Sequence, residues 1–442
     1  MVRIPKVQPI QPVSSTKSGI YLHFPYCLQK CHYCDFYSVG LDEIPGADFQ
    51  RRLKEYESAL LQELQVRCSD SRTPTALESG IARSGSDHSQ QPSFSNQSFD
   101  TIYFGGGTSS LMPPDMIRRI LQALQEYLDI DQAAEVTLEG NPENLNPEYL
   151  VALHEIGVNR VNSGLQTYNA RFLKDMNRYH HTERYAELLE TLVSSPIPRV
   201  GVDLIYGFHG QSYEDFLEDL NRVLEYPIHH LSVYSLTVEP ETRYARNIKR
   251  GRQGSPEEKL QEKIFRELPE HLADRGWNQY EISNYAQGNA ICLHNWKYWQ
   301  YLPYLGLGPG AHGFDGYRRY ANPRNLNAWA SGPGHNQESE LHDPIIDVFL
   351  NLFRITLPID IHRIQNVWGE QGWSQTQTDN LWNALIKKLK SMEKEGLCAL
   401  SEAGIFQWTI DGLTMLDSHI EELIRAVQAA DPNDLDDPSD PN

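Results

Sequence analysis

Three cysteines stand close together near the N-terminus of this 442-residue chain, where Cys27, Cys31 and Cys34 form a C-x3-C-x2-C run. Cysteine thiolates are the usual ligands of iron–sulfur clusters, and three at this spacing can hold three corners of a [4Fe–4S] cube. Because such a cube has four irons, the fourth iron would be open to a small-molecule ligand. The run therefore predicts a metal site at Cys27, Cys31 and Cys34.

The other three cysteines argue against two alternative uses of the run. Cys68, Cys292 and Cys398 are scattered, and no C-x2-C pair follows the run to complete a four-cysteine zinc site. A disulfide framework is typical of short secreted chains, whereas this chain is long. Three cysteines that are simply buried are the remaining alternative. Free thiols and an oxygen-sensitive cluster predict a reducing, cytoplasmic location.

Further polar residues follow apolar runs that have the pattern of strands. The stretch 105–108 reads Gly-Gly-Gly-Thr, and glycine lets a ligand approach the backbone closely, although such a run is usually just a turn. Polar side chains at strand ends are costly to bury unless they are paired or bind a ligand. A structural ion-pair network is the alternative to a binding site. Four such residues stand out: Glu139, Gln166, Arg178 and Asp203.

The elements that would position these residues alternate along the chain. Apolar runs predict strands, and apolar residues at helical spacing predict helices between them. The predicted strands are 19–24, 101–104, 135–139, 160–164, 199–205 and 230–236, and the predicted helices are 49–66, 114–128, 147–156, 183–193 and 213–224. Such alternation implies parallel strands, and six units predict an α/β fold with an incomplete TIM-type (β/α)6 barrel.

The pattern changes after residue 250. A helix is predicted over 255–275, the aromatic and Gly-rich stretch 277–320 has no clear period, and helices are predicted at 347–353, 379–395 and 418–430, with a hairpin around 405–415. This order predicts a small C-terminal winged-helix-like domain. The predicted organisation is an N-terminal tail (1–18), a barrel (19–250) with a flexible insertion (67–100), an extension (251–340), the winged-helix-like domain (341–430) and an acidic tail (431–442).

Composition excludes some classes of function. The chain has 39 Lys and Arg against 59 Asp and Glu, a net charge of −20, which argues against nucleic acid as the main partner. A hydrophobic content of 40% is enough to build a core. The first residues lack the apolar segment of a signal peptide, and no apolar run approaches the roughly 18 residues of a membrane span.

The cysteine run and the Gly-rich stretch together resemble the radical S-adenosylmethionine (SAM) superfamily. In that superfamily the open iron binds SAM, and an electron from the cluster cleaves it to a 5′-deoxyadenosyl radical. The resemblance implies a [4Fe–4S] cluster and SAM as cofactors, although Ser109 stands where the family's glycine element has proline. The positions that match SAM-contacting residues are Tyr21, Tyr33, Gly106, Gly107, Thr108, Glu139, Gln166, Arg178 and Asp203.

Within the superfamily the chain resembles the HemN-like group, which includes coproporphyrinogen III dehydrogenases and HemW-like heme chaperones. The dehydrogenases have a fourth cysteine where this chain has Phe36, and their N-terminal segment is longer than the 18 residues found here. The stretch 294–299 is the HNxxYW motif of the HemW-like proteins, and Pro309-Gly-Ala-His312-Gly also matches that family. The resemblance therefore implies a heme chaperone, with a radical SAM dehydrogenase as the alternative.

The HNxxYW resemblance implicates His294 in heme binding. A neutral imidazole is a good axial ligand, and the neighbouring rings could supply apolar walls for a porphyrin. The alternative is that His294 is a hydrogen-bonded core residue, and His23, His32 and His312 could compete as ligands. The implied partners are heme and an apo-hemoprotein that receives it, and contact with membrane-bound acceptors and a homodimer are compatible with this role. A cluster-bearing interaction protein without heme is the third hypothesis.

Overall fold

The computed structural model of the chain describes residues 15–43, 49–69, 94, 97–178, 181–332, 334, 338–339, 342–370 and 373–430. Most of the predicted insertion, most of the N-terminal tail and the acidic tail lie outside these residues. At the edges of the predicted insertion, a helix runs on to Ser69 and a strand begins at Ser98, so both ends of that interval are regular structure.

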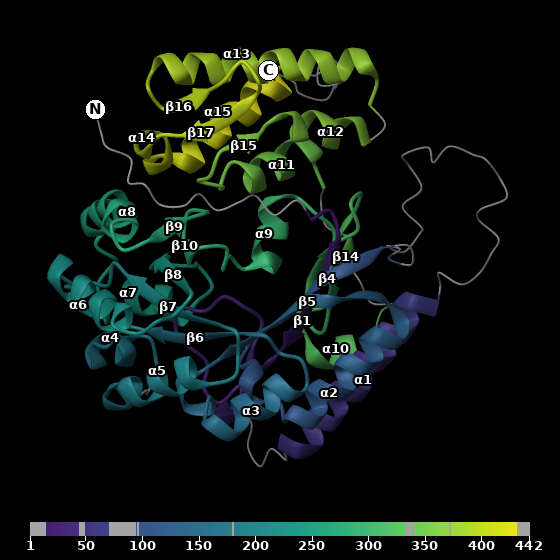
Figure 1. Ribbon diagram of the computed structural model, residues 1–442, viewed down its shortest axis with the longest axis vertical. Coiled ribbons are helices and arrows are strands. Elements are labelled where there is room, and N and C mark those ends of the chain that lie inside the picture. The colour runs from purple at the N-terminus through teal and green to yellow at the C-terminus, as the bar shows by residue number, and fades with distance from the viewer. Residues whose placement is uncertain are drawn as a thin grey trace.

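Six parallel strands form the centre of the fold and follow one another in chain order across the sheet. They are β1 Ser18–Phe24, β4 Ser98–Gly106, β5 Asp129–Gly140, β6 Arg160–Gln166, β7 Arg199–Tyr206 and β8 His230–Ser235. The connecting helices are α1 Phe49–Ser69, α2 Pro114–Tyr127, α3 Pro147–Glu155, α4 Ala170–Asp175, α5 Tyr185–Ser194 and α6 Tyr213–Leu224, and β8 is followed by α7 Arg243–Lys249 and α8 Glu258–Ala273. The predicted barrel of six units is confirmed (Figure 1).

Residues 277–339 extend this sheet at both edges, which their sequence did not indicate. Antiparallel β10 adds to β8, and parallel β11 adds to β1, so within the described residues the sheet has twelve strands and is open. The added elements are β9 Trp277–Gln279, β10 Asn284–Gln287, α9 Leu293–Trp299, β11 Tyr304–Leu307, β12 His312–Phe314, β13 Arg319–Ala321, α10 Leu326–Ser331 and β14 Glu338–Ser339.

The C-terminal residues form a separate layer of helices above the sheet (Figure 1). Their order is helix, strand, two helices and a strand pair, which is the arrangement of a winged helix. The elements are α11 Pro344–Leu352, β15 Ile359–Asp360, α12 His362–Glu370, α13 Gln375–Lys394, β16 Cys398–Leu400, β17 Ile405–Trp408, α14 Ile410–Thr414 and α15 Leu416–Gln428. The hairpin predicted around 405–415 is wrong, because Ile405–Trp408 pairs back with β16 and Thr409 caps a short helix.

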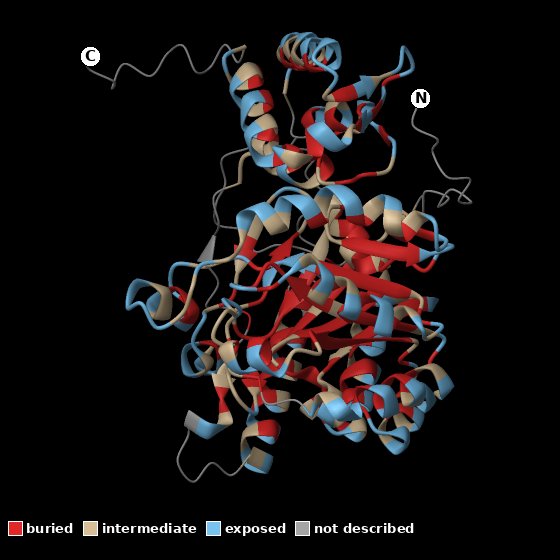
Figure 2. Cartoon of the chain, turned by 90° about the vertical axis from the view of Figure 1, so that its left-hand side faces the viewer, coloured by how far each residue is buried: buried red, intermediate tan, exposed pale blue. Residues whose placement is uncertain are grey.

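The two faces of the barrel strands have opposite character. Side chains alternate between faces along a strand, and the outward face carries Ile20, Leu22, Ile102 and Leu138, all buried against the helices. The inward face is polar, because the alternate positions hold tyrosine, histidine, carboxylate and arginine side chains. Figure 2 shows the buried strands running through the centre of the molecule. Among the predicted site residues, Tyr21, Glu139 and Asp203 stand at these inward positions.

Candidate functional site

The cysteine run lies on the loop that follows β1. Two short strands bracket it, β2 Tyr26–Cys27 and β3 Val39–Gly40, which pair in parallel. The loop is tied to the segment after α4, since His32 N donates to Met176 O and Asn177 Nδ2 donates to Lys30 O. Cys27, Cys31 and Cys34 are all partly buried and have no disulfide partner.

Burial and the neighbouring thiols act in the same direction on Cys27 and Cys34. Burial first, and then the neighbouring thiols, raise the pKa of Cys27, and together they raise the pKa of Cys34 to about 12. The Thr108 hydroxyl and Arg178 act in the opposite direction on Cys27. Burial therefore disfavours the thiolate forms of Cys27 and Cys34, and the positive charge of iron would favour them. In the described part of the chain, no three His, Cys, Asp or Glu are arranged to hold a single metal ion.

The Gly-rich stretch after β4 packs against the start of the cysteine loop. Gly107 N donates to Phe24 O at 2.6 Å, and Thr108 N donates to Tyr26 O at 2.8 Å. A Cβ on Gly107 would lie 2.6 Å from Tyr26 O, and Gly106 has a φ of 106°. Glycine is therefore required at these positions by the approach of the two backbone segments and by the left-handed conformation.

Two carboxyl groups face the interior near the carboxyl ends of the strands. Tyr103 Oη donates to Glu139 Oε1 at 2.5 Å, and burial raises the pKa of Glu139 to about 7, with Asp203 adding to the effect. Burial also raises the pKa of Asp203 to about 6. Among the described residues, no hydrogen-bond partner reaches the buried Oδ1 of Asp203, and the same holds for Thr137 Oγ1 and Asn162 Oδ1. Such unpaired groups fit a site that binds a polar ligand.

Gln166 and Arg178 meet beside the cysteine loop. Arg178 is buried and donates to Tyr33 Oη at 3.2 Å and to Asn141 Oδ1 at 2.8 Å. A Cβ on Gly164 would lie 2.6 Å from Gln166 Nε2 and 3.4 Å from Arg178 Nη2, so both side chains cover this glycine. Gln166 has a φ of 69° at a β-bulge, a strained conformation that is found most often at functional sites.

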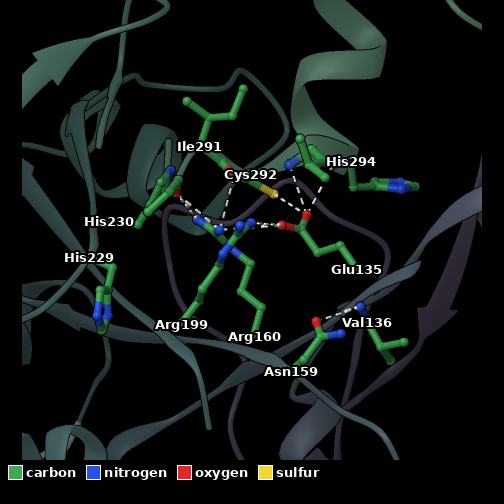
Figure 3. A network of polar contacts seen from close by, with 12 residues as sticks. Glu135, Val136, Asn159, Arg160, Arg199, His229, His230, Ile291, Cys292 and His294 are labelled. Carbon is green, nitrogen blue, oxygen red and sulfur yellow. Dashed lines mark hydrogen bonds and ion pairs between the residues drawn. The ribbon is translucent and has the colours of Figure 1, made fainter. Parts of the chain in front are cut away.

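The HNxxYW helix α9 lies at the opposite end of the barrel from the cysteines. Glu135 Oε1 accepts hydrogen bonds from Leu293 N and His294 N at the start of this helix, and Arg160 donates to the carbonyl oxygens of Ala290 and Ile291. Arg160 is the first residue of its strand. Figure 3 shows Arg160 and Arg199 facing the Glu135 carboxylate. We call this layer the floor: Glu135, Arg160, Arg199 and residues 290–299.

His294 is fully enclosed in the floor. Its Nδ1 is hydrogen-bonded to Thr101 Oγ1 at 2.9 Å and its Nε2 to Tyr298 Oη at 2.8 Å. The ring stacks on Tyr103 with 5.1 Å between centroids, and burial lowers its pKa to about 3. Tyr21 stacks on both rings, at 6.2 and 6.3 Å. In this conformation neither nitrogen of His294 is free to ligate iron.

The other histidines that could compete as ligands differ in access. His23 is buried and lies at the cysteine end, where its Nε2–H donates to Tyr37 O and its Nδ1 accepts from Tyr21 Oη. His32 lies within the cysteine loop, and in the part of the chain that the structure describes its buried Nε2 has no hydrogen-bond partner. His312 is exposed at the start of β12.

The floor residues Glu135, Arg160 and Arg199 were missed by the sequence analysis. The signal that could have found them is the alternation along the strands, since Glu135, Thr137 and Glu139 share one face.

The chain is similar to several known proteins. The radical SAM superfamily model matches residues 93–223. The mouse protein "Radical S-adenosyl methionine domain-containing protein 1, mitochondrial" is 30% identical over 443 residues, which cover 96% of this chain and 91% of that protein. The chain belongs to the radical SAM superfamily. Membership implies a [4Fe–4S] cluster and SAM.

Two further relatives are named as heme chaperones. "Heme chaperone HemW" of Buchnera aphidicola is 30% identical over 352 residues, which cover 77% of this chain and 84% of that protein. "Heme chaperone HemW" of Mycobacterium tuberculosis is 30% identical over 321 residues, covering 73% and 75%. The solved structure of coproporphyrinogen III oxidase (HemN) from Escherichia coli has a TM-score of 0.71 at 20% identity, covering 93% of this chain and 90% of that one. At this identity the structure confirms the fold alone.

Proposed function

We propose that this radical SAM protein is a heme chaperone that binds a [4Fe–4S] cluster, SAM and heme, and delivers heme to an apo-hemoprotein. The observation that carries the proposal is the similarity, over most of the chain, to proteins named heme chaperone HemW. Phe36 supports it, because it stands where the dehydrogenases have a fourth cysteine and its side chain is 67% exposed beside the run.

Cys27, Cys31 and Cys34 would hold the cluster, and SAM would lie across the carboxyl ends of the strands. The polar groups there support this assignment, since Asp203 has an unpaired oxygen and Arg178 is a buried cation beside the cysteine loop. Glu139, Gln166, Gly106, Gly107 and Thr108 would form the rest of the SAM site, with Tyr21 and Tyr33 as its aromatic neighbours. The cluster and SAM supply radical chemistry when bound, and the chain's own residues orient them and exclude water.

Heme ligation by His294, which the motif predicts, requires a conformation in which its ring no longer bonds both Thr101 and Tyr298. The hydrogen bonds to Thr101 and Tyr298 must break before either ring nitrogen can reach iron. His312 is the accessible alternative, because it is exposed and belongs to a stretch that also matches the HemW-like proteins.

The second candidate function is that of an oxygen-independent coproporphyrinogen III dehydrogenase. It is favoured by the shared fold with the Escherichia coli coproporphyrinogen III oxidase over 93% of this chain. Phe36 argues against it, since a phenyl ring cannot replace a thiolate. This enzyme is therefore the activity to be measured beside heme binding.

The deciding experiment titrates anaerobically reconstituted protein with heme and then adds apo-myoglobin as an acceptor. The expected result is stoichiometric heme binding, transfer of heme to apo-myoglobin, and no decarboxylation of coproporphyrinogen III under reducing conditions with SAM. A protein that binds no heme, or one that decarboxylates the porphyrinogen efficiently, would contradict the chaperone function.

The proposed location is the cytoplasm, and the proposed partners are heme and a hemoprotein acceptor. The helices within the described residues include none that is both long and apolar enough to cross a membrane. The mouse relative is named as a mitochondrial protein. Contact with membrane-bound acceptors and dimer formation stay predictions.

A further inference from the structure

One stretch of this acidic chain carries only positive charges. Residues 243–252 hold five cations and no carboxylate, in a chain whose net charge is −20. All five are exposed, and among the described residues no ion pair joins any of them to an acidic side chain. We call these residues the α7 patch: Arg243, Arg246, Lys249, Arg250 and Arg252.

The α7 patch borders the cysteine loop directly. Tyr244 N donates to His32 O at 2.8 Å, and His32 lies between Cys31 and Cys34 in the chain. The cations therefore lie at the edge of the loop proposed to hold the cluster.

A small apolar cluster fixes the helix in this place. Tyr244 and Ile248 of α7 pack with Tyr33 of the loop and with Phe172 and Leu173 of α4. The neighbouring α4 adds two exposed cations, Arg171 and Lys174. Figure 1 shows α7 beside α4 on one flank of the barrel. The α7 patch is therefore held in place by the packing of α7 against α4 and the cysteine loop.

Charge selects the kind of partner that fits this surface. A chain of net charge −20 repels an acidic protein over most of its surface, whereas the α7 patch attracts it, so an acidic partner would be steered to the edge of the cysteine loop. Electron transfer between proteins requires two redox centres to come close, and a weak, charge-steered encounter is the usual form of such complexes.

We propose that the α7 patch docks an acidic one-electron donor protein of the [2Fe–2S] ferredoxin class. The reduced donor gives one electron to the [4Fe–4S]2+ cluster at Cys27, Cys31 and Cys34, which becomes [4Fe–4S]+ while the donor cluster is oxidised by one electron. No proton moves and no covalent bond changes. The proposal rests on the cluster of the proposed function but not on heme transfer.

The test compares two charge-reversal variants of the reconstituted protein. R246E/K249E/R250E inverts the α7 patch, and K387E/K390E/K394E makes the same change in net charge on exposed lysines of α13. The rate constant for cluster reduction by reduced plant-type [2Fe–2S] ferredoxin is measured by stopped flow at several salt concentrations, beside reduction by dithionite. Binding of oxidised ferredoxin is measured by calorimetry as a readout that needs no electron transfer.

The expected result is a fall of at least tenfold in the ferredoxin rate for the α7 variant at low salt, converging with the wild-type rate at high salt. The α13 variant should stay within about twofold of wild type, and dithionite should reduce all three proteins alike. If dithionite reduction also fails in the α7 variant, R246Q/K249Q/R250Q replaces it, with the same loss expected.

Three outcomes overturn the proposal. One is an unchanged ferredoxin rate and affinity in the α7 variants, and another is an equal loss in the α13 variant, which would reflect net charge alone. The third is a tenfold loss of heme affinity in the α7 variants with an unchanged ferredoxin rate, which would show that the patch binds the carboxylates of the porphyrin. If heme transfer fails while the salt-sensitive ferredoxin reaction persists, the proposed chaperone function falls and this inference stands.

Discussion

At the scale of single residues, burial controls which groups in the barrel carry charge. Glu139 and Asp203 face a polar but enclosed interior, and their pKa values rise to about 7 and about 6 because desolvation disfavours the carboxylate. Arg178 is a buried cation on the same side as the cysteines. The charge state of this interior therefore responds to pH near neutrality, which an exposed set of the same residues would not do.

We expect Glu139 to make folding less favourable as the pH rises. Its folded pKa of about 7 lies above the ordinary value of 4.5, so the folded state holds a proton that the unfolded state has lost. Stability contributed by this proton is present below about pH 4.5 and is lost as the pH passes through 7. Between pH 5 and 8, the free energy of unfolding of apo Glu139→Gln should fall by about 1–3 kcal/mol less than that of the wild type. The thermal midpoint of the variant should fall less over the same range.

Glu402→Gln is the matched control for Glu139, because Glu402 is exposed and its substitution should leave the pH profile unchanged. Identical pH profiles for wild type and Glu139→Gln would show that Glu139 ionises normally in the folded protein.

We expect the three cysteines of the loop to be individually required for the cluster. Removing one ligand leaves two thiolates, which cannot hold a cube that already lacks a fourth protein ligand. Cys31→Ala should lose most of the iron and sulfide that the wild type takes up on anaerobic reconstitution. Cys398→Ala, a buried cysteine in the C-terminal layer, should reconstitute normally. Near-normal iron content in Cys31→Ala would place the cluster elsewhere.

At the scale of elements, α9 closes the amino end of the barrel through a buried ion pair and backbone hydrogen bonds. Glu135 is buried and accepts from two backbone N–H groups at the start of this helix, where a negative charge is also favoured by the helix dipole. Arg160 bonds the carbonyl oxygens that precede the helix. These bonds hold the HNxxYW helix against the strands.

His294→Ala should destabilise the protein before heme is added. The substitution removes a buried ring that bonds Thr101 and Tyr298, and it leaves a cavity beside Tyr103. The expected cost is about 2–4 kcal/mol, seen as a lower thermal midpoint of the apo protein. His181→Ala, which changes an exposed histidine, should leave the midpoint within about a degree of wild type.

Heme titration of the same His294→Ala protein tests the ligand prediction. Wild-type stability of the apo variant together with an altered Soret band would show that His294 ligates heme and contributes little to the stability of the apo protein. A destabilised apo protein with an unchanged Soret band would assign the residue to the floor.

At the scale of the whole molecule, residues 277–299 join the barrel to the C-terminal layer. Tyr280, Ile291 and Trp296 belong to one apolar core with α11 and the helices that follow it. Glu281 forms an isolated β-bridge with Ile355. The HNxxYW helix thus contacts the barrel on one side and the C-terminal layer on the other.

A chain cut after residue 340 should therefore be poorly soluble. The cut exposes Tyr280, Ile291 and Trp296, which are buried in the full chain, and a new apolar patch of this kind favours aggregation. Light scattering and cluster content of the fragment check this prediction. A monomeric fragment that reconstitutes a cluster would show that the barrel and the extension fold without the C-terminal layer.

The sequence by itself determined the six repeated units and the place of the cysteine run after the first strand, because strand and helix periodicity are local properties of the chain. The tertiary structure alone decided that residues 277–339 add strands to both edges of the sheet, since edge pairing depends on backbone partners far away in sequence. It also placed His294 at the end of the barrel away from the cysteines, with both ring nitrogens hydrogen-bonded. A motif specifies residue types, whereas the burial and hydrogen bonding that set what an imidazole can bind arise only when distant segments pack together.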